Sequence, residues 1–220
     1  MDGLVEGKVL RRTNRFTLEV EVRGRVEKAN LRDSGRLPEL VKAGNRALLK
    51  PKSGGKTSYT VFILFDRKTP VFVNSSFHSL LAEKILKSEG YEILGKEVKV
   101  NGSRIDFLAE KSGEKKLVEV KGCTLVRNSV ALFPDAPTER GLKHVKILEK
   151  YGGELLFLIM RDDAEIFSPN YETHEEFAVT LERARERILV RAAKLKPDVN
   201  GDELELKFLG YVPVAFKKVI

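Results

Sequence analysis

The feature that most constrains the fold is one long run of apolar residues in the C-terminal half of the chain. It spans residues 155–160 and reads Leu-Leu-Phe-Leu-Ile-Met without a polar interruption. Such a run is typical of a strand that is buried on both faces of a sheet. Helix-like apolar spacing surrounds it, at residues 76–89, 140–150 and 174–195. The pattern predicts a mixed α/β domain over residues 71–220, closed by a strand pair at 203–208 and 212–218.

The first part of the chain has a different pattern, in which short strand-like segments alternate with turns. Turn signals such as Thr13-Asn14 and Arg23-Gly24 separate segments rich in Val and Leu. Strands are expected at residues 5–10, 16–22, 26–30, 46–50 and 58–65. Five short strands in about 70 residues fit a small β-barrel of the oligonucleotide-binding (OB) type. We therefore predict an α+β chain whose residues 1–70 form an OB-fold-like barrel, with the domain boundary at 66–70.

Charge is distributed unevenly between these two regions. The chain has 40 Lys and Arg against 32 Asp and Glu, and residues 1–70 contain 16 of the basic and 8 of the acidic residues. The whole net charge of +8 therefore belongs to the predicted barrel, as expected of a module that binds a polyanion such as DNA. The candidate nucleic-acid contacts are arginines at predicted turns and one aromatic residue for base stacking, namely Arg11, Arg12, Arg15, Arg36 and Phe16. In the alternative interpretation, Phe16 belongs to the core and the arginines only keep the domain soluble.

Composition excludes several classes of protein. The single cysteine, Cys123, rules out an internal disulfide and fits a reducing cytoplasm. One Cys and three scattered His do not supply the ligands of a structural zinc site. No apolar run approaches the roughly 18 residues of a membrane-spanning helix, and the first residues lack the layout of a secretory signal. We therefore expect a cytoplasmic protein without a membrane partner, while the oligomeric state is left open.

Two neighbouring strand-like segments carry the residues with the clearest chemistry. Residues 103–110 and 116–121 flank a short polar loop, which is the pattern of a β-hairpin. Side chains two apart on a strand share a face, so Glu119 and Lys121 lie together. Asp106, a lone charge between two apolar residues, is expected opposite them. If Asp106 lies opposite them, two carboxylates and one amine converge where the two strands meet.

This set of side chains suits metal-assisted phosphodiester hydrolysis. Two carboxylates hold a hard cation such as Mg²⁺ through oxygen. A lysine beside that cation positions or deprotonates a water, or stabilises developing negative charge. The predicted catalytic residues are thus Asp106, Glu119 and Lys121. In the alternative interpretation these residues are only the solvated face of a half-buried sheet, since short motifs often match by chance.

Two predicted helices carry further candidates. Glu83, in the helix at 76–89, borders the apolar face, where it is either a further metal ligand or an exposed residue. Arg140, Lys143 and His144, in the helix at 140–150, are candidates for phosphate contact. A lone histidine such as His144 is more often a structural residue than a base.

Several fragments together resemble one known family. They span most of the chain in order and are Arg12-Thr13-Asn14-Arg15-Phe16, Asp33-Ser34-Gly35-Arg36-Leu37, Ser103-Arg104-Ile105-Asp106-Phe107, Val118-Glu119-Val120-Lys121-Gly122-Cys123-Thr124-Leu125 and Phe133-Pro134-Asp135-Ala136-Pro137-Thr138-Glu139-Arg140-Gly141. They resemble the sugar fermentation stimulation protein (SfsA) family. The resemblance implies an N-terminal OB fold, a C-terminal domain like the PD-(D/E)XK nucleases, non-specific DNA binding and a regulatory role in sugar metabolism.

The resemblance also implies roles for individual residues. Asp106 and Glu119 match the metal-binding acids of the nuclease motif, and Lys121 matches its lysine. The Val120 carbonyl would be a further metal ligand, and Glu83 matches the helical acid that some of these nucleases use. The implied cofactor is Mg²⁺ or Mn²⁺ and the implied partner is single- or double-stranded DNA. Three hypotheses remain: a metal-dependent DNA nuclease, a DNA-binding regulator that keeps a nuclease fold without turnover, and a soluble scaffold whose basic face meets some other polyanion.

Overall fold

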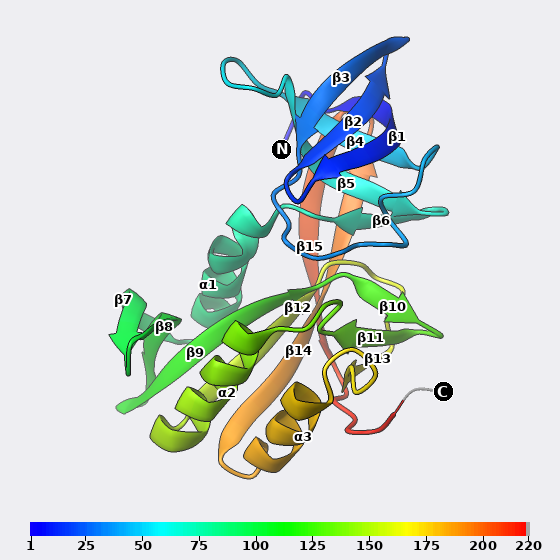
Figure 1. Ribbon diagram of the computed structural model, residues 1–220. Coiled ribbons are helices and arrows are strands. Elements are labelled where there is room, and N and C mark those ends of the chain that lie inside the picture. The colour runs from blue at the N-terminus through cyan, green and yellow to red at the C-terminus, as the bar shows by residue number, and fades with distance from the viewer. Residues whose placement is uncertain (219–220) are drawn as a thin grey trace. The chain divides into compact units, whose positions relative to one another are not determined.

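The computed structural model describes residues 1–218 and divides the chain into two compact units (Figure 1). The first unit comprises Met1–Ser76 together with two short later segments, Met160–Asp163 and Leu195–Leu209. The second comprises Phe77–Ile159, Ala164–Lys194 and the chain from Gly210. This division is discontinuous in the sequence, whereas the sequence pattern suggested one boundary at 66–70. No helix in the described part of the chain has the length and hydrophobicity needed to cross a membrane.

The first unit is built on a closed five-stranded barrel, as the sequence predicted. Strands β1 to β5 follow the order β3-β2-β1-β4-β5, and β3 pairs with β5 to close the barrel. A further strand, β6, pairs with β5. The bounds are β1 Val5–Asn14, β2 Thr17–Val22, β3 Arg25–Asn30, β4 Arg46–Pro51, β5 Tyr59–Asp66 and β6 Thr69–Phe72.

Alternation of apolar and polar residues creates the barrel core. On β2, Leu18, Val20 and Val22 are buried, while Glu19 and Glu21 between them are not. Residues two apart share a face of a strand, so the apolar set lines the interior and the charged set faces solvent. Gly7 on β1 allows close strand approach, because a Cβ there would lie 2.9 Å from the Glu21 carbonyl oxygen.

The second unit contains most of a six-stranded mixed sheet with the order β15-β14-β12-β9-β8-β7. Strand β12, Gly153–Ile159, is parallel to both of its neighbours, and its residues from Glu154 to Ile159 are all buried. The prediction of a central strand is therefore confirmed. The other strands are β7 Glu92–Val100, β8 Ser103–Lys111, β9 Glu114–Cys123, β14 Ile188–Asn200 and β15 Glu203–Val212, with a small second sheet of β10 Leu125–Arg127, β11 Val130–Phe133 and β13 Ile166–Pro169.

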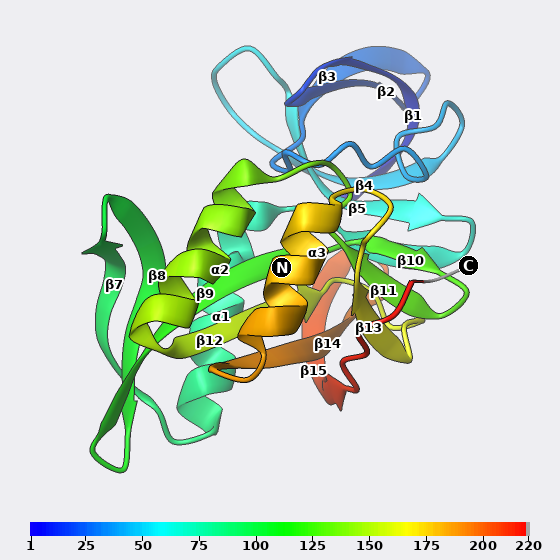
Figure 2. The same cartoon turned by 60° about the horizontal axis from the view of Figure 1, so that its bottom comes forward.

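Helices cover both faces of the large sheet. Helix α1, His78–Ser88, lies on one face after a 3-10 turn, while α2, Glu139–Tyr151, and α3, Glu175–Ala184, lie side by side on the other (Figure 2). The Thr138 hydroxyl caps α2 by accepting a hydrogen bond from the Gly141 N–H at 3.1 Å. The core under α2 and α3 includes Val145, Leu155, Phe157 and Phe177.

The prediction of one long helix at 174–195 is wrong. Helix α3 ends at Ala184, and from Ile188 the chain forms β14, which pairs in parallel with β12. Ile188 and Ala192 are buried and four residues apart, so they fit a helical stripe and a strand face equally well. Pairing with β12 decides between the two, which is a tertiary effect that no local pattern contains.

The predicted closing strand pair is also wrong in part. One strand, β15, covers residues 203–212 and lies beside β14 at the end of the sheet. Beyond Val212 the described chain contains only an isolated bridge, between Val214 and Phe167. The expected strand at 212–218 is therefore absent.

Candidate metal-binding site

The candidate site lies where β8 and β9 separate. Their ladder ends at the pair Phe107 and Val118, whereas β9 continues beside β12 as far as Cys123. Asp106 and Glu119 come immediately beyond that last pair. Asp106 Oδ2 accepts a hydrogen bond from the Val120 N–H at 2.8 Å, so a side chain takes the place of the missing ladder partner. Separation of the strands thus leaves the two acids just beyond the last paired residues of the ladder.

Glu119 and Lys121 lie on one face of β9, as their spacing predicted. The Lys121 ammonium donates to Glu119 Oε1, and both side chains are largely buried. The face is the one covered by α2. The predicted cluster of two carboxylates and one amine is therefore present in the geometry of the hairpin.

A histidine that the sequence did not assign to this cluster completes it. His144, on α2, is 1% exposed, and its Nδ1 lies 2.5 Å from Glu119 Oε1 and 3.3 Å from Lys121 Nζ. Because an ionised carboxylate only accepts, the Nδ1 atom carries the proton and donates it to Glu119. The sequence feature that could have indicated this contact is the position of His144 on the buried side of α2, next to Val145.

The electrostatic environments of the two acids differ. Burial and the neighbouring Glu119 raise the pKa of Asp106 to about 6. Burial also tends to raise the pKa of Glu119, but the hydrogen bond from His144 and the charge of Lys121 outweigh it and lower that pKa. At neutral pH Glu119 is therefore firmly ionised, whereas Asp106 exchanges a proton close to the physiological range.

One oxygen of Glu119 marks where a ligand would bind. Oε1 accepts from His144 and Lys121, whereas Oε2 is buried without a hydrogen-bond partner among the described residues. A buried carboxylate oxygen left without a partner is costly, and an ion or water is the usual explanation. Within residues 1–218 no three or more His, Cys, Asp or Glu side chains are grouped to hold a metal. A cation beside Glu119 would thus be held by two carboxylates, with backbone carbonyl and water oxygens completing its shell.

A second histidine lies against the same strand from α1. The His78 ring contacts Gly122 so closely that a Cβ there would lie 2.1 Å from the ring Cε1. Its Nε2 is buried and has no hydrogen-bond partner in the described chain. Burial, together with the charge of Lys121, lowers the pKa of His78 to about 4, so the ring is neutral at pH 7. Gly122 therefore allows α1 to approach the strand next to the acid cluster.

Glu83, the other predicted metal ligand, has its contacts elsewhere. Its carboxylate pairs with Lys87 at 2.8 Å and with Lys96 at 2.6 Å, and it is 14% exposed. These two lysines lower its pKa. The structure therefore does not bring Glu83 together with Asp106 and Glu119.

The predicted nucleic-acid contacts of the barrel fall into two kinds. The guanidinium of Arg12 donates to the backbone carbonyls of Arg15 at 2.6 Å, Gly35 at 2.8 Å and Arg36 at 2.7 Å. It thereby ties together two loops that are distant in sequence. Arg15 and Arg36 are exposed, and the Arg15 guanidinium lies 5.5 Å from the centre of the Phe16 ring.

The exposure of Phe16 decides whether this residue belongs to the barrel core or lies on the surface. The side chain is 49% exposed, so the alternative that placed it in the barrel core is wrong. Arg11 is also exposed, but it pairs with Glu19 at 2.6 Å. Arg140 is exposed in the first turn of α2. Arg15, Arg36 and Phe16 form the exposed tip of the barrel, and the term barrel tip is used for these three residues below.

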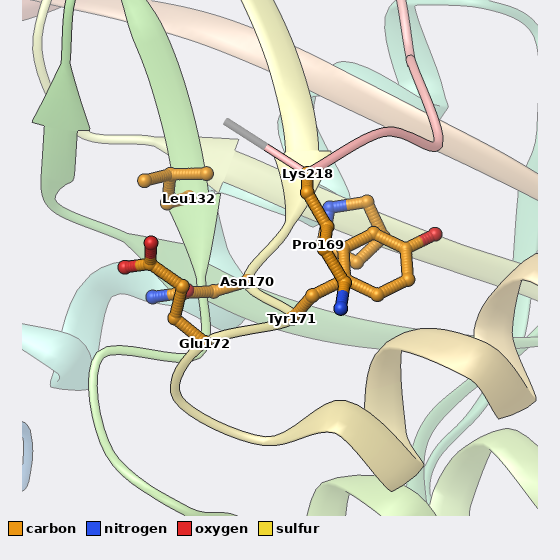
Figure 3. A pocket seen from close by; sticks show the side chains of 6 residues that line it. All are labelled: Leu132, Pro169, Asn170, Tyr171, Glu172 and Lys218. Atoms are coloured by element: carbon orange, nitrogen blue, oxygen red, sulfur yellow. The ribbon is translucent and has the colours of Figure 1, made fainter. Parts of the chain in front are cut away.

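A small pocket elsewhere in the second unit carries no comparable chemistry (Figure 3). Its polar lining groups have partners in the protein: Glu172 pairs with Arg127 at 3.0 Å, and the Asn170 amide donates to the Pro134 carbonyl at 3.0 Å. The pocket shares no lining residue with the acid cluster. Its lining consists of Leu132, Pro169, Asn170, Tyr171, Glu172 and Lys218.

Two family models match the chain, one for each region that the sequence distinguished. The model described as the SfsA N-terminal OB domain matches residues 10–73. The model described as the Sugar fermentation stimulation protein RE domain matches residues 71–201. Together they account for almost the whole length.

Individual relatives agree with these matches. A sugar fermentation stimulation protein homolog from Methanothermobacter thermautotrophicus is 45% identical over 214 residues, covering 91% of this chain and 89% of the relative. A homolog of the same name from Methanosphaera stadtmanae is 35% identical over 99% of this chain and 98% of its own. Among solved structures, Pyrococcus furiosus SfsA in complex with Ca²⁺ is similar with a TM-score of 0.89 and 28% identity, covering 98% of each chain.

Proposed function

This chain belongs to the sugar fermentation stimulation protein family, and on that premise we propose that it is a DNA-binding protein with a divalent-metal-dependent nuclease site. The proposal rests on one observation above all. Glu119 has a buried carboxylate oxygen without a hydrogen-bond partner among the described residues, beside a second, partly buried carboxylate whose pKa is raised. That is the environment expected of two acids that share a cation.

The proposed cofactor is Mg²⁺ or Mn²⁺. Asp106, Glu119 and the Val120 carbonyl would hold it, since hard cations prefer oxygen ligands. The relative from Pyrococcus furiosus was solved in complex with Ca²⁺, which supports a divalent cation here. When bound, the ion would supply Lewis-acid activation of a phosphodiester and of a water.

The protein's own groups have separate roles in this proposal. The Lys121 ammonium would position the attacking water or stabilise negative charge that develops on the phosphate. The exposed arginines of the barrel tip would bind DNA phosphates, and Phe16 would offer a stacking surface for a base. Arg11 and Arg140 would add phosphate contacts. Arg12 would act indirectly, because its guanidinium is bound to backbone carbonyls.

A second candidate function is a DNA-binding regulator without turnover. The observation that favours it is the engagement of Lys121, whose amine is paired with Glu119 rather than free. The family description, stimulation of sugar fermentation, is also compatible with regulation. In this case the acid cluster would be only a structural remnant of a nuclease fold.

Incubation with DNA and Mn²⁺ distinguishes the two functions. Single- and double-stranded substrates are incubated with the wild-type chain and with Asp106→Ala, and both cleavage and binding are measured. Cleavage that is lost in the variant while binding persists supports the nuclease. Intact DNA with both proteins, bound with equal affinity, supports the regulator. Failure of the wild-type chain to bind DNA contradicts both.

A further inference from the structure

We propose that His144 is a positioning residue that fixes Glu119 for the cation and releases Lys121 for the substrate. The inference rests on the proposed metal site and adds a task that two carboxylates and a lysine cannot perform alone. The observation behind it is the difference in hydrogen bonding between the two carboxylate oxygens of Glu119.

The two oxygens of Glu119 have opposite environments. Oε1 accepts from both the His144 imidazole and the Lys121 ammonium, whereas Oε2 is buried and accepts from no described residue. A carboxylate held by donors on one oxygen presents the other in a fixed direction. The direction of Oε2 is therefore set by the contacts on Oε1.

The two donors to Oε1 differ in mobility. His144 is on α2, is 1% exposed, and is followed by the fully buried Val145 and, one turn later, by Leu148. Lys121 has a long flexible side chain that is 16% exposed. The imidazole is thus a permanent donor, while the ammonium can turn away to a ligand.

This difference explains why a second donor is needed. If Lys121 alone held Glu119, its movement towards a phosphate or a water would leave Oε1 buried and unpaired, which is strongly unfavourable. With His144 in place, Oε1 keeps a hydrogen bond when Lys121 leaves. Residues that orient a metal ligand from outside the coordination shell commonly matter in this way.

Three variants test the role of the imidazole Nδ1–H. His144→Asn places an amide nitrogen close to the position of Nδ1 and keeps the donor, whereas His144→Leu removes it. Lys150→Ala, at an exposed lysine on the same helix that has no role in the proposed site, is the matched control. Mn²⁺ binding is measured by calorimetry without DNA, so the readout does not depend on catalysis.

The expected order of affinities is specific. His144→Leu should bind Mn²⁺ at least about tenfold more weakly, as is typical for loss of an outer-shell partner. His144→Asn should recover most of the affinity, and Lys150→Ala should match the wild type. Equal affinity of His144→Leu and wild type would overturn the inference. If His144→Leu does not fold, His144→Gln replaces it, because its amide is displaced towards the Nε2 position.

A crystal structure of His144→Leu without metal provides a second test, which does not depend on whether the chain binds a cation or cleaves DNA. We expect the Glu119 carboxylate to turn towards Lys121 and to leave its present orientation. An unchanged carboxylate would refute the role of His144, whether or not metal binds. Failure of the wild-type chain to bind Mn²⁺ would instead refute the metal site, and a displaced Glu119 would still support the role of His144 as the residue that orients it.

Discussion

The barrel tip and the acid cluster use charge in opposite ways. At the tip, Arg15 and Arg36 are exposed and carry part of an excess of positive charge. In the cluster, Asp106, Glu119 and Lys121 are mostly buried and interact directly with one another. Interactions of exposed charges extend over several ångströms and are weakened by salt. Buried charges interact through direct contacts with their neighbours, and these contacts shift their pKa values. The comparison predicts that the proposed DNA binding and the proposed hydrolysis can be separated by experiment.

The largest expected effect tests the acid cluster alone. Asp106→Asn keeps the size of the side chain but removes a negative ligand. We expect Mn²⁺-dependent cleavage to fall by at least about 100-fold, beyond the range usual for outer-shell changes. DNA affinity, measured by fluorescence anisotropy, should stay close to that of the wild type. A parallel loss of cleavage and binding would remove the proposed separation of the two regions.

The next effect concerns the scaffold of the barrel tip. Arg12→Ala removes a charged donor from several backbone carbonyls, and we expect the free energy of unfolding to fall by about 2 kcal/mol. Arg11→Ala is the control, since Arg11 is exposed and exposed ion pairs such as its pair with Glu19 contribute little to stability. Denaturant titration measures both. Equal losses would mean that Arg12 does not organise the loops.

A smaller effect concerns the pH dependence of Mn²⁺ affinity at the acid cluster, in contrast to the salt dependence expected at the barrel tip. The pKa of Asp106 is raised to about 6, so the carboxylate is ionised above that pH and protonated below it. A proton competes with a cation for the same oxygen, so Mn²⁺ affinity should fall by about tenfold per pH unit below 6. Calorimetry across that range provides the measurement. Affinity that is constant between pH 5 and 7 would contradict the assignment of Asp106 as a ligand.

The smallest effect tests the barrel tip as a contact surface. Arg15→Glu should weaken DNA binding a few-fold. It should also reduce the slope of log affinity against log salt concentration by about one or more. Arg187→Glu, which reverses an exposed charge just after α3, is the control and should change little. Equal effects of the two reversals would mean that binding follows net charge and not the position of the tip.

Local patterns were sufficient where the neighbours of a residue in sequence are also its neighbours in space. The barrel strands and the central strand β12 followed from alternation, turn signals and one apolar run. The cluster of Asp106, Glu119 and Lys121 followed from a hairpin, in which sequence spacing determines which side chains face each other.

The rest depended on contacts between distant segments. β14 was mistaken for a helix because Ile188 and Ala192 fit both periodicities, and only pairing with β12 decides. His144 reaches Glu119 through the packing of α2 on the sheet, which no spacing in the sequence encodes. His78 is fixed by contact with Gly122, and a glycine alone does not reveal what packs against it.

The hydrogen bond from the Val120 N–H to Asp106 has a further consequence for the proposed cation site. It attaches one acid to the peptide group that directly follows the other, so the position of the Asp106 carboxylate depends on the backbone of β9 as well as on its own strand. A change that displaces this part of β9 should therefore displace both acids together, and it should weaken cation binding at the proposed site although neither acid is replaced.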